Sequence, residues 1–416
     1  MGAYQIIGGR PLRGVIPIHG AKNSMLPILA ATLVSGGTCV LHNCPQISDA
    51  DAALTILQSL GCQVKREGDT LIVDTYAADG TEIPAALMQK MRAAVIFLGA
   101  LLARFGRARL SHPGGCRLGE RPIDLHLMGL RMLGASCVYE GEELLCTAHK
   151  PEAATIALPF PSVGATENLL LAALSCEGET VLCNAAREPE IGDLIGFLIA
   201  CGAEIEGVGT SVLRIHGRRP LHGAEYTIMP DRMEAATYLC AAAATRGELT
   251  LTQAEPNHLC AVTDILLRGG CELRQSAREL TLRCDALRAV SPIRTAPYPA
   301  FPTDAQAPVM AAMATAEGVS IFEETVFSDR FRHVPALRQM GAKITATKRC
   351  AVVEGVPVLR GAGVEATDLR GGAAMVIAAL AAQGESIITK TEHTERGYAE
   401  LVSSLRACGA EISLTE

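Results

Sequence analysis

A stretch rich in glycine and proline, SHPGGCRLGERP at residues 111–122, presents one cysteine among basic residues. Cys116 is followed by Arg117 and Arg121, and nearby cations favour a thiolate or let a thiol give and take protons. The composition of the stretch favours neither helix nor strand. Cys240, by contrast, lies in the apolar run TYLCAAAA, as expected for a packed core thiol. We therefore expect Cys116 to meet a ligand on a loop.

Basic residues also stand where apolar helices are expected to begin. They are Lys22, Arg92, Arg232 and Arg370, although ordinary helix starts favour acids. One such cation alone is most simply a solvated or salt-bridged residue, but several at equivalent places need another explanation. Together with free helix N–H groups they predict a site for phosphate or carboxylate, and hence a polyanionic substrate. Ser and Asp at the same places are most simply N-caps.

These helices belong to a six-fold internal repeat. Six amphipathic helices are each expected to end at a glycine in the left-handed conformation, with the glycines about 70 residues apart. The marker glycines are Gly61, Gly134, Gly202, Gly270, Gly341 and Gly409. Six further helix-length segments are apolar nearly all round and must be buried. Each repeat therefore combines one buried helix, one amphipathic helix and several strands.

Chain length decides how these repeats are grouped. Six repeats in 416 residues are too many for a single core, so we expect two domains of three repeats each, with helices inside and sheets outside. A helical solenoid is the alternative, and the strands between the helices speak against it. The polyanionic substrate is expected between the two domains.

Composition excludes several classes of protein. The net charge of −7 argues against non-specific binding to nucleic acid. The longest apolar run, residues 93–103, is too short to cross a membrane, and we see no secretory signal peptide. The 15 cysteines are odd in number and none are spaced CxxC, which argues against zinc-ribbon and thioredoxin sites and favours a reduced, cytoplasmic protein.

Several motifs in chain order carry a family resemblance over nearly all of the chain. They are GAKNSMLPILAATLVSGG, PGGCRLGERPIDLH, PSVGATEN, NAAREPEI, RTAPYPAFPTD, ATDLR and HTERGY. In these motifs the chain resembles the UDP-N-acetylglucosamine enolpyruvyl transferases. The resemblance implies an α/β fold of two pseudo-symmetric inside-out barrel domains. It places one domain at residues 22–229, with the catalytic loop 111–122, and the other at residues 1–21 plus 230–416, with the active site between them.

The resemblance also implies an activity. Enolpyruvyl would pass from phosphoenolpyruvate to the 3′-hydroxyl of UDP-N-acetylglucosamine, with release of phosphate, by addition and then elimination. This is the first committed step of peptidoglycan precursor synthesis, and it needs no metal and no cofactor. By the same resemblance Cys116 would donate a proton and react with fosfomycin, Asp304 would be the general base, and Lys22 would lie at the reacting centre.

Binding residues follow from the same resemblance. Those implied for phosphoenolpyruvate are Lys22, Asn23, Arg121, Arg330, Arg370 and Arg396. Those implied for UDP-N-acetylglucosamine are Asn23, Arg92, Arg121, Pro122, Ile123, Asp124, Leu125, Ser162, Val163, Gly164, Asp304 and Val326. Two departures from the family accompany them: Phe160 stands where some members have a basic residue, and the pair Gly371-Gly372 is expected to loosen a helix start.

Several alternatives stay open at this point. His126 and His393 flank the motifs, and each is either catalytic or holds a loop by hydrogen bonds. The closest rival activity is that of 5-enolpyruvylshikimate-3-phosphate synthase, which shares the fold and differs in the acceptor. A non-catalytic sugar-nucleotide sensor is the rival of another class, and it would be expected to have lost Cys116, Lys22, Asp304 or Arg396.

Overall fold

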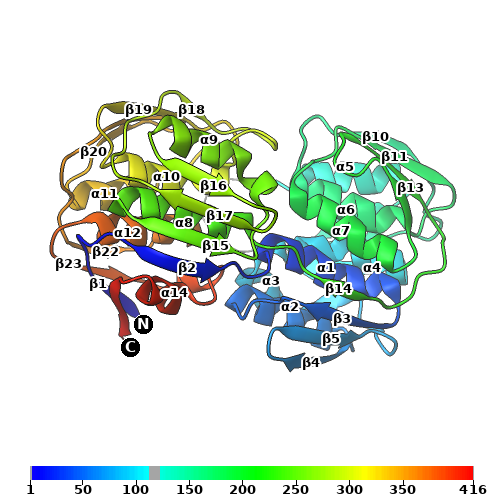
Figure 1. The fold of residues 1–416 in the computed structure, drawn as a ribbon. Helices are drawn as coiled ribbons and strands as arrows, with labels where there is room; N and C mark the ends of the chain where they lie inside the picture. The colour runs from blue at the N-terminus through cyan, green and yellow to red at the C-terminus, as the bar shows by residue number, and fades with distance from the viewer. Residues whose placement is uncertain (1, 112–121, 416) are drawn as a thin grey trace. The chain divides into compact units, whose positions relative to one another are not determined.

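The computed structural model describes residues 2–111 and 122–415 (Figure 1). Contacts within the chain divide these residues into two compact units. One, which we call the terminal unit, contains residues 2–19 and 230–415. The other, the central unit, contains residues 20–111 and 122–229. The first strands of the chain thus fold with its C-terminal part.

Each unit is built around three apolar helices whose residues are almost all buried. In the central unit they are α1 (Lys22–Ser35), α4 (Phe97–Phe105) and α6 (Val163–Ala173). In the terminal unit they are α8 (Arg232–Thr245), α10 (Gln306–Met313) and α12 (Leu369–Ala381). Within each unit the three helices pack against one another in every pair. A helix enclosed in this way has no polar face, which explains the sequence pattern.

Two of these helices are preceded by a tighter turn. The 3-10 helix η1 (Arg92–Ile96) leads into α4, and η3 (Thr303–Ala305) leads into α10. The apolar run over residues 93–103 therefore begins as a 3-10 turn and continues as α4. A 3-10 turn at a helix terminus is a frequent way to adjust where the backbone enters the helix.

The six amphipathic helices cover the buried ones. They are α2 (Ser48–Ser59), α5 (Asp124–Met132), α7 (Pro189–Ala200), α9 (Cys260–Arg268), α11 (Val334–Gln339) and α14 (Leu401–Ala407). The six marker glycines that follow them have φ between 85° and 97°, which confirms the predicted left-handed conformation. The shorter helices are α3 (Ala85–Lys90), η2 (Pro256–Leu259) and α13 (Glu392–Glu395).

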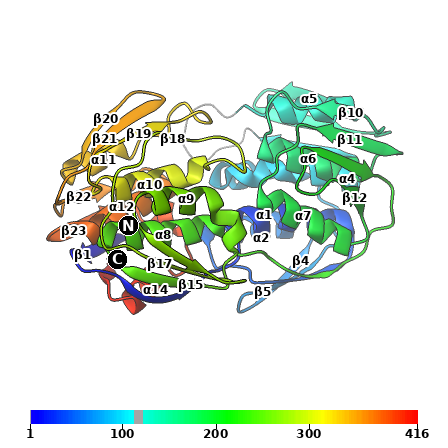
Figure 2. The same ribbon diagram turned by 45° about the horizontal axis from the view of Figure 1, so that its top comes forward.

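Among residues 2–111 and 122–415, six four-stranded sheets form the outer layer, three in each unit (Figure 2). Those of the central unit are β14 (Glu225–Thr227), β3 (Thr38–His42), β5 (Thr70–Asp74), β4 (Gln63–Glu67); β6 (Glu82–Ile83), β7 (Arg107–Ser111), β9 (Glu143–Thr147), β8 (Ser136–Glu140); and β10 (Thr155–Ala157), β11 (Glu179–Cys183), β13 (Val212–His216), β12 (Glu204–Glu206).

Those of the terminal unit are β18 (Ile293–Arg294), β19 (Val319–Glu323), β21 (Cys350–Glu354), β20 (Lys343–Ala346); β22 (Gly363–Glu365), β23 (Glu385–Thr389), β1 (Ala3–Ile7), β24 (Glu411–Thr415); and β16 (Glu272–Gln275), β17 (Glu279–Arg283), β15 (Glu248–Thr252), β2 (Arg13–Pro17).

The connections close each unit into a ring. In every sheet three strands are antiparallel, and a fourth, parallel edge strand is supplied by another repeat of the same unit. In the central unit β6 pairs with β7, β10 with β11, and β14 returns to β3. In the terminal unit β1 lies between β23 and β24, while β2 pairs with β15. Strand β1 therefore completes the sheet of the last repeat, and β2 completes the sheet of β15, β16 and β17.

The strands bury alternate residues against the helices. On β15, for example, Leu249 and Leu251 are fully buried while Thr250 between them is half-buried. Cys44, Cys62 and Cys271 are also buried, as expected for small packing residues. Over the described residues no helix combines the length and the apolar character needed to span a membrane.

Candidate active site

In the central unit Lys22 is the first residue of α1, where Ala21 offers no side-chain cap. Lys22 Nζ lies 2.6 Å from Asp49 Oδ2, and both side chains are largely buried. Asp49 comes from the first turn of α2, a favourable place for a carboxylate. The sequence predicted a bound anion near this cation, and the structure supplies a carboxylate of the chain as one partner. Asn23, the next residue, is exposed.

A hydrogen-bond cluster that the sequence did not predict fixes the first turn of α1. Ser24 Oγ donates to Asp193 Oδ2 on α7. Asp193 Oδ1 also accepts from Tyr226 Oη at 2.8 Å, and burial raises the pKa of Asp193 against the lowering effect of its donors. The cluster ties α1, α7 and the strand β14 together directly after Lys22.

Helix α6 begins with three of the residues that the resemblance implies for UDP-N-acetylglucosamine. Ser162 Oγ accepts from Ala165 N at 3.3 Å, so the simpler explanation of Ser162 as an N-cap is confirmed. Val163 is the first helical residue. A β carbon at Gly164 would lie 3.1 Å from His126 Cε1, so the glycine lets the imidazole pack against the helix start.

His126 is held by a buried hydrogen-bond network. Asn168 Oδ1 accepts from Gly99 N at 2.6 Å, and its Nδ2 donates to Val95 O at 3.0 Å. The same Nδ2 lies 2.7 Å from His126 Nδ1. Because an amide nitrogen only donates, His126 Nδ1 is the acceptor and Nε2 carries the proton of a neutral ring. For His126 the structure therefore favours the role of holding its segment.

Part of the predicted site lies outside the described residues. Cys116 and Arg121 fall within residues 112–121, and the side chain of Arg92 at the start of η1 is not described either. The rest of the segment predicted to bind the nucleotide is described: Pro122 and Asp124 are exposed, Ile123 and Leu125 are half-buried, and α5 begins at Asp124.

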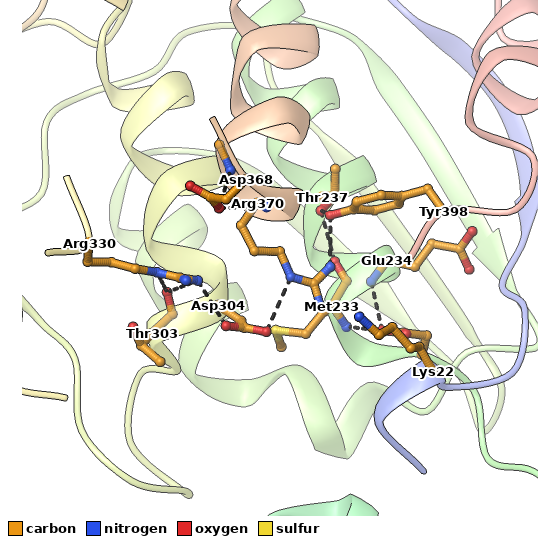
Figure 3. A network of polar contacts seen from close by, with 12 residues as sticks. Lys22, Met233, Glu234, Thr237, Thr303, Asp304, Arg330, Asp368, Arg370 and Tyr398 are labelled. Carbon is orange, nitrogen blue, oxygen red and sulfur yellow. Dashed lines mark hydrogen bonds and ion pairs between the residues drawn. The ribbon is translucent and has the colours of Figure 1, made fainter. Parts of the chain in front are cut away.

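In the terminal unit a carboxylate lies between two buried guanidinium groups (Figure 3). Arg330 Nη2 donates to Asp304 Oδ1 at 2.8 Å, and Arg370 Nε donates to Asp304 Oδ2 at 3.2 Å. The two arginine side chains are 2% and 4% exposed, whereas that of Asp304 is 31% exposed. These three groups together carry one net positive charge, which favours a further anion near the exposed side of the carboxylate.

Glu324 positions this cluster and the predicted residue Val326, although the sequence analysis did not identify it. The side chain is buried, its Oε1 accepts from Val326 N at 2.8 Å, and its Oε2 accepts from Thr303 Oγ1 at 2.9 Å. Thr303 O in turn accepts from Arg330 Nη2 at 3.2 Å. One carboxylate thus fixes both the loop that carries Val326 and the residue that precedes Asp304.

Helix α12 starts in a regular way despite its two glycines. Asp368 Oδ1 accepts from Arg370 N and from Gly371 N, both at 3.1 Å, and so caps the helix. A β carbon at Gly372 would lie 2.1 Å from Thr394 Oγ1, so this glycine allows α13 to pack closely on α12. At the glycine pair, which the sequence suggested as a loosening feature, the structure shows a helix start that is capped by Asp368 and closely packed.

The starts of the three buried helices converge on Arg370. Asp231 caps α8 by accepting from Met233 N at 2.7 Å, and Asp304 precedes α10. Burial alone would lower the pKa of Arg370, but the neighbouring Tyr398, Asp304 and Asp231 raise that pKa overall, so the guanidinium stays charged. The positive charge of Arg370 is therefore partly compensated by carboxylates at the neighbouring helix starts. The spacing of residues in the sequence could not reveal this pairing.

Arg396 directly follows α13 and is half-buried. Two residues later the buried Tyr398 contacts Arg370 Nη1 and Thr237 Oγ1 through its hydroxyl (Figure 3). Neither Tyr398 nor Thr237 was predicted from the sequence. The available signals were a tyrosine within the motif HTERGY and a threonine inside an otherwise apolar helix. Among the described residues no group of three or more His, Cys, Asp or Glu could hold a metal ion.

Comparisons with known proteins show the family to which the chain belongs. Residues 6–405 match the family described as EPSP synthase (3-phosphoshikimate 1-carboxyvinyltransferase). A UDP-N-acetylglucosamine 1-carboxyvinyltransferase of Acidiphilium cryptum is 47% identical over 414 residues, covering 99% of both chains. A UDP-N-acetylglucosamine 1-carboxyvinyltransferase 2 of Caldanaerobacter subterraneus subsp. tengcongensis is 46% identical over 413 residues, again covering 99% of both. The chain belongs to the UDP-N-acetylglucosamine 1-carboxyvinyltransferase family.

Solved structures share the fold. The enolpyruvyl transferase NikO from Streptomyces tendae is 28% identical with a TM-score of 0.90, covering 100% of this chain and 99% of that chain. An EPSP synthase from Acinetobacter baumannii is 19% identical with a TM-score of 0.75 and covers 100% of both, which shows the fold alone. Together with buried helices enclosed by six sheets, these similarities confirm the predicted α/β fold class of inside-out barrels.

Proposed function

We propose that this chain transfers the enolpyruvyl group of phosphoenolpyruvate to the 3′-hydroxyl of UDP-N-acetylglucosamine and releases phosphate. The observation that carries the proposal is identity of 46% and 47%, over 99% of both chains, to proteins named UDP-N-acetylglucosamine 1-carboxyvinyltransferase. The proposed setting is the cytoplasm, and the proposed role is the first committed step of peptidoglycan precursor synthesis.

The chemistry requires an acid and a base. In the addition step the sugar hydroxyl oxygen bonds to C2 of phosphoenolpyruvate, its proton goes to a base, and C3 receives a proton from an acid. In the elimination step C3 returns a proton, the C2–O bond to phosphate breaks, and the double bond forms again. We assign Cys116 as the acid at C3 and Asp304 as the base at the hydroxyl. The 31% exposure of the Asp304 side chain, beside two buried arginines, supports this assignment.

Positive charge must meet both the carboxylate of the substrate and the departing phosphate. We assign this role to Lys22, Asn23 and Arg121, and in the terminal unit to Arg330, Arg370 and Arg396. Arg330 and Arg370 are buried and already oriented by hydrogen bonds, so little reorganisation is needed when an anion binds. Preorganised charge of this kind is usually the largest single contribution to catalysis.

The nucleotide sugar needs a site for its diphosphate and its uridine. We assign the diphosphate to Ser162, Val163 and Gly164, because the first N–H groups of α6 have no partner within the helix. The other proposed contacts are Asn23, Arg92, Arg121, Pro122, Ile123, Asp124, Leu125, Asp304 and Val326. Phe160, which is exposed just before this helix start, brings no charge to the diphosphate.

The acceptor is what separates this proposal from its nearest rival. The matched family is described by the name of the shikimate enzyme, and an EPSP synthase has the same fold. That structure is 19% identical to this chain, whereas the relatives named for the UDP-sugar are 44% to 47% identical. The higher identity therefore favours UDP-N-acetylglucosamine over shikimate 3-phosphate.

Phosphate release tests the proposal directly. The purified chain is incubated with phosphoenolpyruvate alone, with added UDP-N-acetylglucosamine, and separately with shikimate 3-phosphate. We expect phosphate release only with the UDP-sugar. Release only with shikimate 3-phosphate would mean that the acceptor is wrong within the right fold, and no release with either would favour a non-catalytic sensor.

A further inference from the structure

We propose that Tyr398 is a positioning residue that holds the guanidinium of Arg370 ready for phosphoenolpyruvate. The inference deepens the proposed function and rests on it, because Arg370 is taken there as a ligand of that substrate. Tyr398 itself contacts no reacting atom in this proposal. Its effect passes entirely through the arginine.

The contacts of Arg370 show what holds it. Its Nε donates to Asp304 at 3.2 Å, and its Nη1 donates to Tyr398 Oη at 3.0 Å (Figure 3). The guanidinium carbon also lies 5.5 Å from the centre of the Tyr398 ring. Asp304 is half-exposed and is itself assigned a proton-transfer role, whereas Tyr398 is only 3% exposed. Tyr398 is therefore the more buried of these two contacts, and the one to which no proton transfer is assigned.

The direction of each hydrogen bond follows from counting hydrogens. Thr237 Oγ1 donates its single hydrogen to Met233 O at 2.9 Å, one turn earlier on α8. The hydroxyl of Tyr398, 2.7 Å from Thr237 Oγ1, must then donate to it. The Tyr398 oxygen is left as an acceptor, and Arg370, which only donates, uses it. A chain of three hydrogen bonds thus runs from Arg370 to the backbone of α8.

The same tyrosine anchors the segment that carries Arg396. This segment follows α13, and a β carbon at Gly397 would lie 2.9 Å from Leu369 Cδ2, so the glycine allows it to press onto the start of α12. Tyr398, the next residue, then reaches Arg370 on α12 and Thr237 on α8. The tripeptide Arg396-Gly397-Tyr398 combines a proposed ligand, a close approach and an anchor.

A proton-transfer role for Tyr398 is disfavoured by its surroundings. Burial raises the pKa of Tyr398, although Arg370, Thr237 and their hydrogen bonds act in the opposite direction. The hydroxyl therefore stays protonated, and its hydrogen is already committed to Thr237. This predicts that removing the hydroxyl changes binding of the anion without adding or removing a limb of the pH–rate profile.

The test uses Tyr398→Phe in the full chain, with binding and kinetics measured separately. Losing an acceptor for a charged donor is expected to weaken binding of phosphoenolpyruvate about ten- to a hundredfold. Isothermal titration calorimetry with phosphoenolpyruvate alone, with no UDP-N-acetylglucosamine present, gives this change without turnover. In the kinetic assay KM for phosphoenolpyruvate rises, KM for the UDP-sugar stays the same, and the pH profile keeps its shape.

Thr237 variants test the direction of the chain. Thr237→Val removes the acceptor of the Tyr398 hydrogen and is expected to weaken phosphoenolpyruvate binding, though less than Tyr398→Phe does. Thr237→Ser keeps a hydroxyl and is expected to bind phosphoenolpyruvate as the unaltered chain does. Tyr238→Phe is the matched control, because it removes the hydroxyl of another buried tyrosine, which lies next to Thr237 on α8. We expect its binding and kinetics to equal those of the unaltered chain.

Three results would overturn the inference. They are unchanged phosphoenolpyruvate binding in Tyr398→Phe, an equal rise of both KM values, and a loss in Tyr238→Phe as large as in Tyr398→Phe. Failure of the proposed function looks different, since the unaltered chain would then release no phosphate with the UDP-sugar. In that case the calorimetric comparison with phosphoenolpyruvate still decides whether Tyr398 supports an anion site at Arg370.

Discussion

Replacing Asp304 by asparagine tests whether the carboxylate holds the terminal unit together as well as serving the reaction. In the structure its two oxygens accept from Arg330 and Arg370, one each. The asparagine side chain would keep one accepting oxygen, but its amide nitrogen would face the other guanidinium as a second donor. The substitution Asp304→Asn therefore leaves two buried cations without the negative charge that they share.

The magnitude follows from burial. Removing one partner of a buried ion pair costs about 3–5 kcal/mol, because the remaining charge is left uncompensated. The Asp304 side chain is 31% exposed, and asparagine keeps one acceptor, so we expect the lower end. The free energy of unfolding of the terminal unit should fall by about 3 kcal/mol. Activity should also fall by about 10²- to 10⁴-fold, as for loss of a general base.

Urea unfolding followed by circular dichroism measures the stability change. Asp285→Asn is the matched control, since Asp285 pairs with Arg283 on the surface of the same unit and is 70% exposed. That control should change the free energy of unfolding by no more than about 0.5 kcal/mol. Inorganic phosphate should restore stability to Asp304→Asn, by about 2.7 kcal/mol at a hundred times its dissociation constant. Equal unfolding curves for the Asp304 and Asp285 variants would refute the reasoning.

Three further predictions concern acid stability, helix packing and the loop cysteine. Burial lowers the pKa of His333 from 6.5 to about 4, so below pH 6.5 the unfolded chain takes up a proton that the folded chain does not. The stability that comes from the neutral His333 ring is complete above pH 6.5 and is lost as the pH falls toward 4. Between pH 7 and 5 the free energy of unfolding of His333→Asn, measured with urea, should fall by about 2 kcal/mol less than that of the unaltered chain. Parallel pH profiles of the two proteins would contradict this. A β carbon at Gly99 would lie 2.2 Å from Asn168 O, so Gly99→Ala should lower the free energy of unfolding by about 1–3 kcal/mol. The nearest atom to a β carbon at Gly192 would be 3.8 Å away, so Gly192→Ala should be neutral or stabilising by up to about 1 kcal/mol. A lower urea midpoint for Gly192→Ala than for Gly99→Ala would contradict this reading of the space around the two glycines. Cys116→Ala should lose most activity and all inactivation by fosfomycin, whereas Cys116→Asp should stay active and resist the drug; an alanine variant that fosfomycin still inactivates would contradict the role of the thiol.

The repeated backbone could be predicted from the sequence because it depends on local and periodic signals. The six marker glycines mark helix ends, since only glycine takes positive φ there without strain. Apolar residues on every side of a segment require burial on every side, which α1 and α8 illustrate. The N-caps Ser162 and Asp368 could also be predicted, because a cap and its helix are neighbours in sequence.

The partners of the charged side chains could not be predicted in this way. Asp304 and Arg370 are 66 positions apart, and Thr237 and Tyr398 are 161 apart, so no local pattern links them. The sequence indicated cations at helix starts and an anion to meet them. It did not indicate that Asp49 and Asp304 would supply part of that negative charge from within the chain.

The sequence by itself determined the repeat, the burial of one helix in each repeat, and the family to which the motifs belong. Only the tertiary structure decided which polar groups share one core. Hydrophobic burial is non-directional and follows composition, so a periodic pattern is enough to predict it. A hydrogen bond or an ion pair depends on separations of a few ångströms between residues far apart in the chain. For Asp304, Arg370 and Tyr398, those separations are set by how α10, α12 and α13 pack.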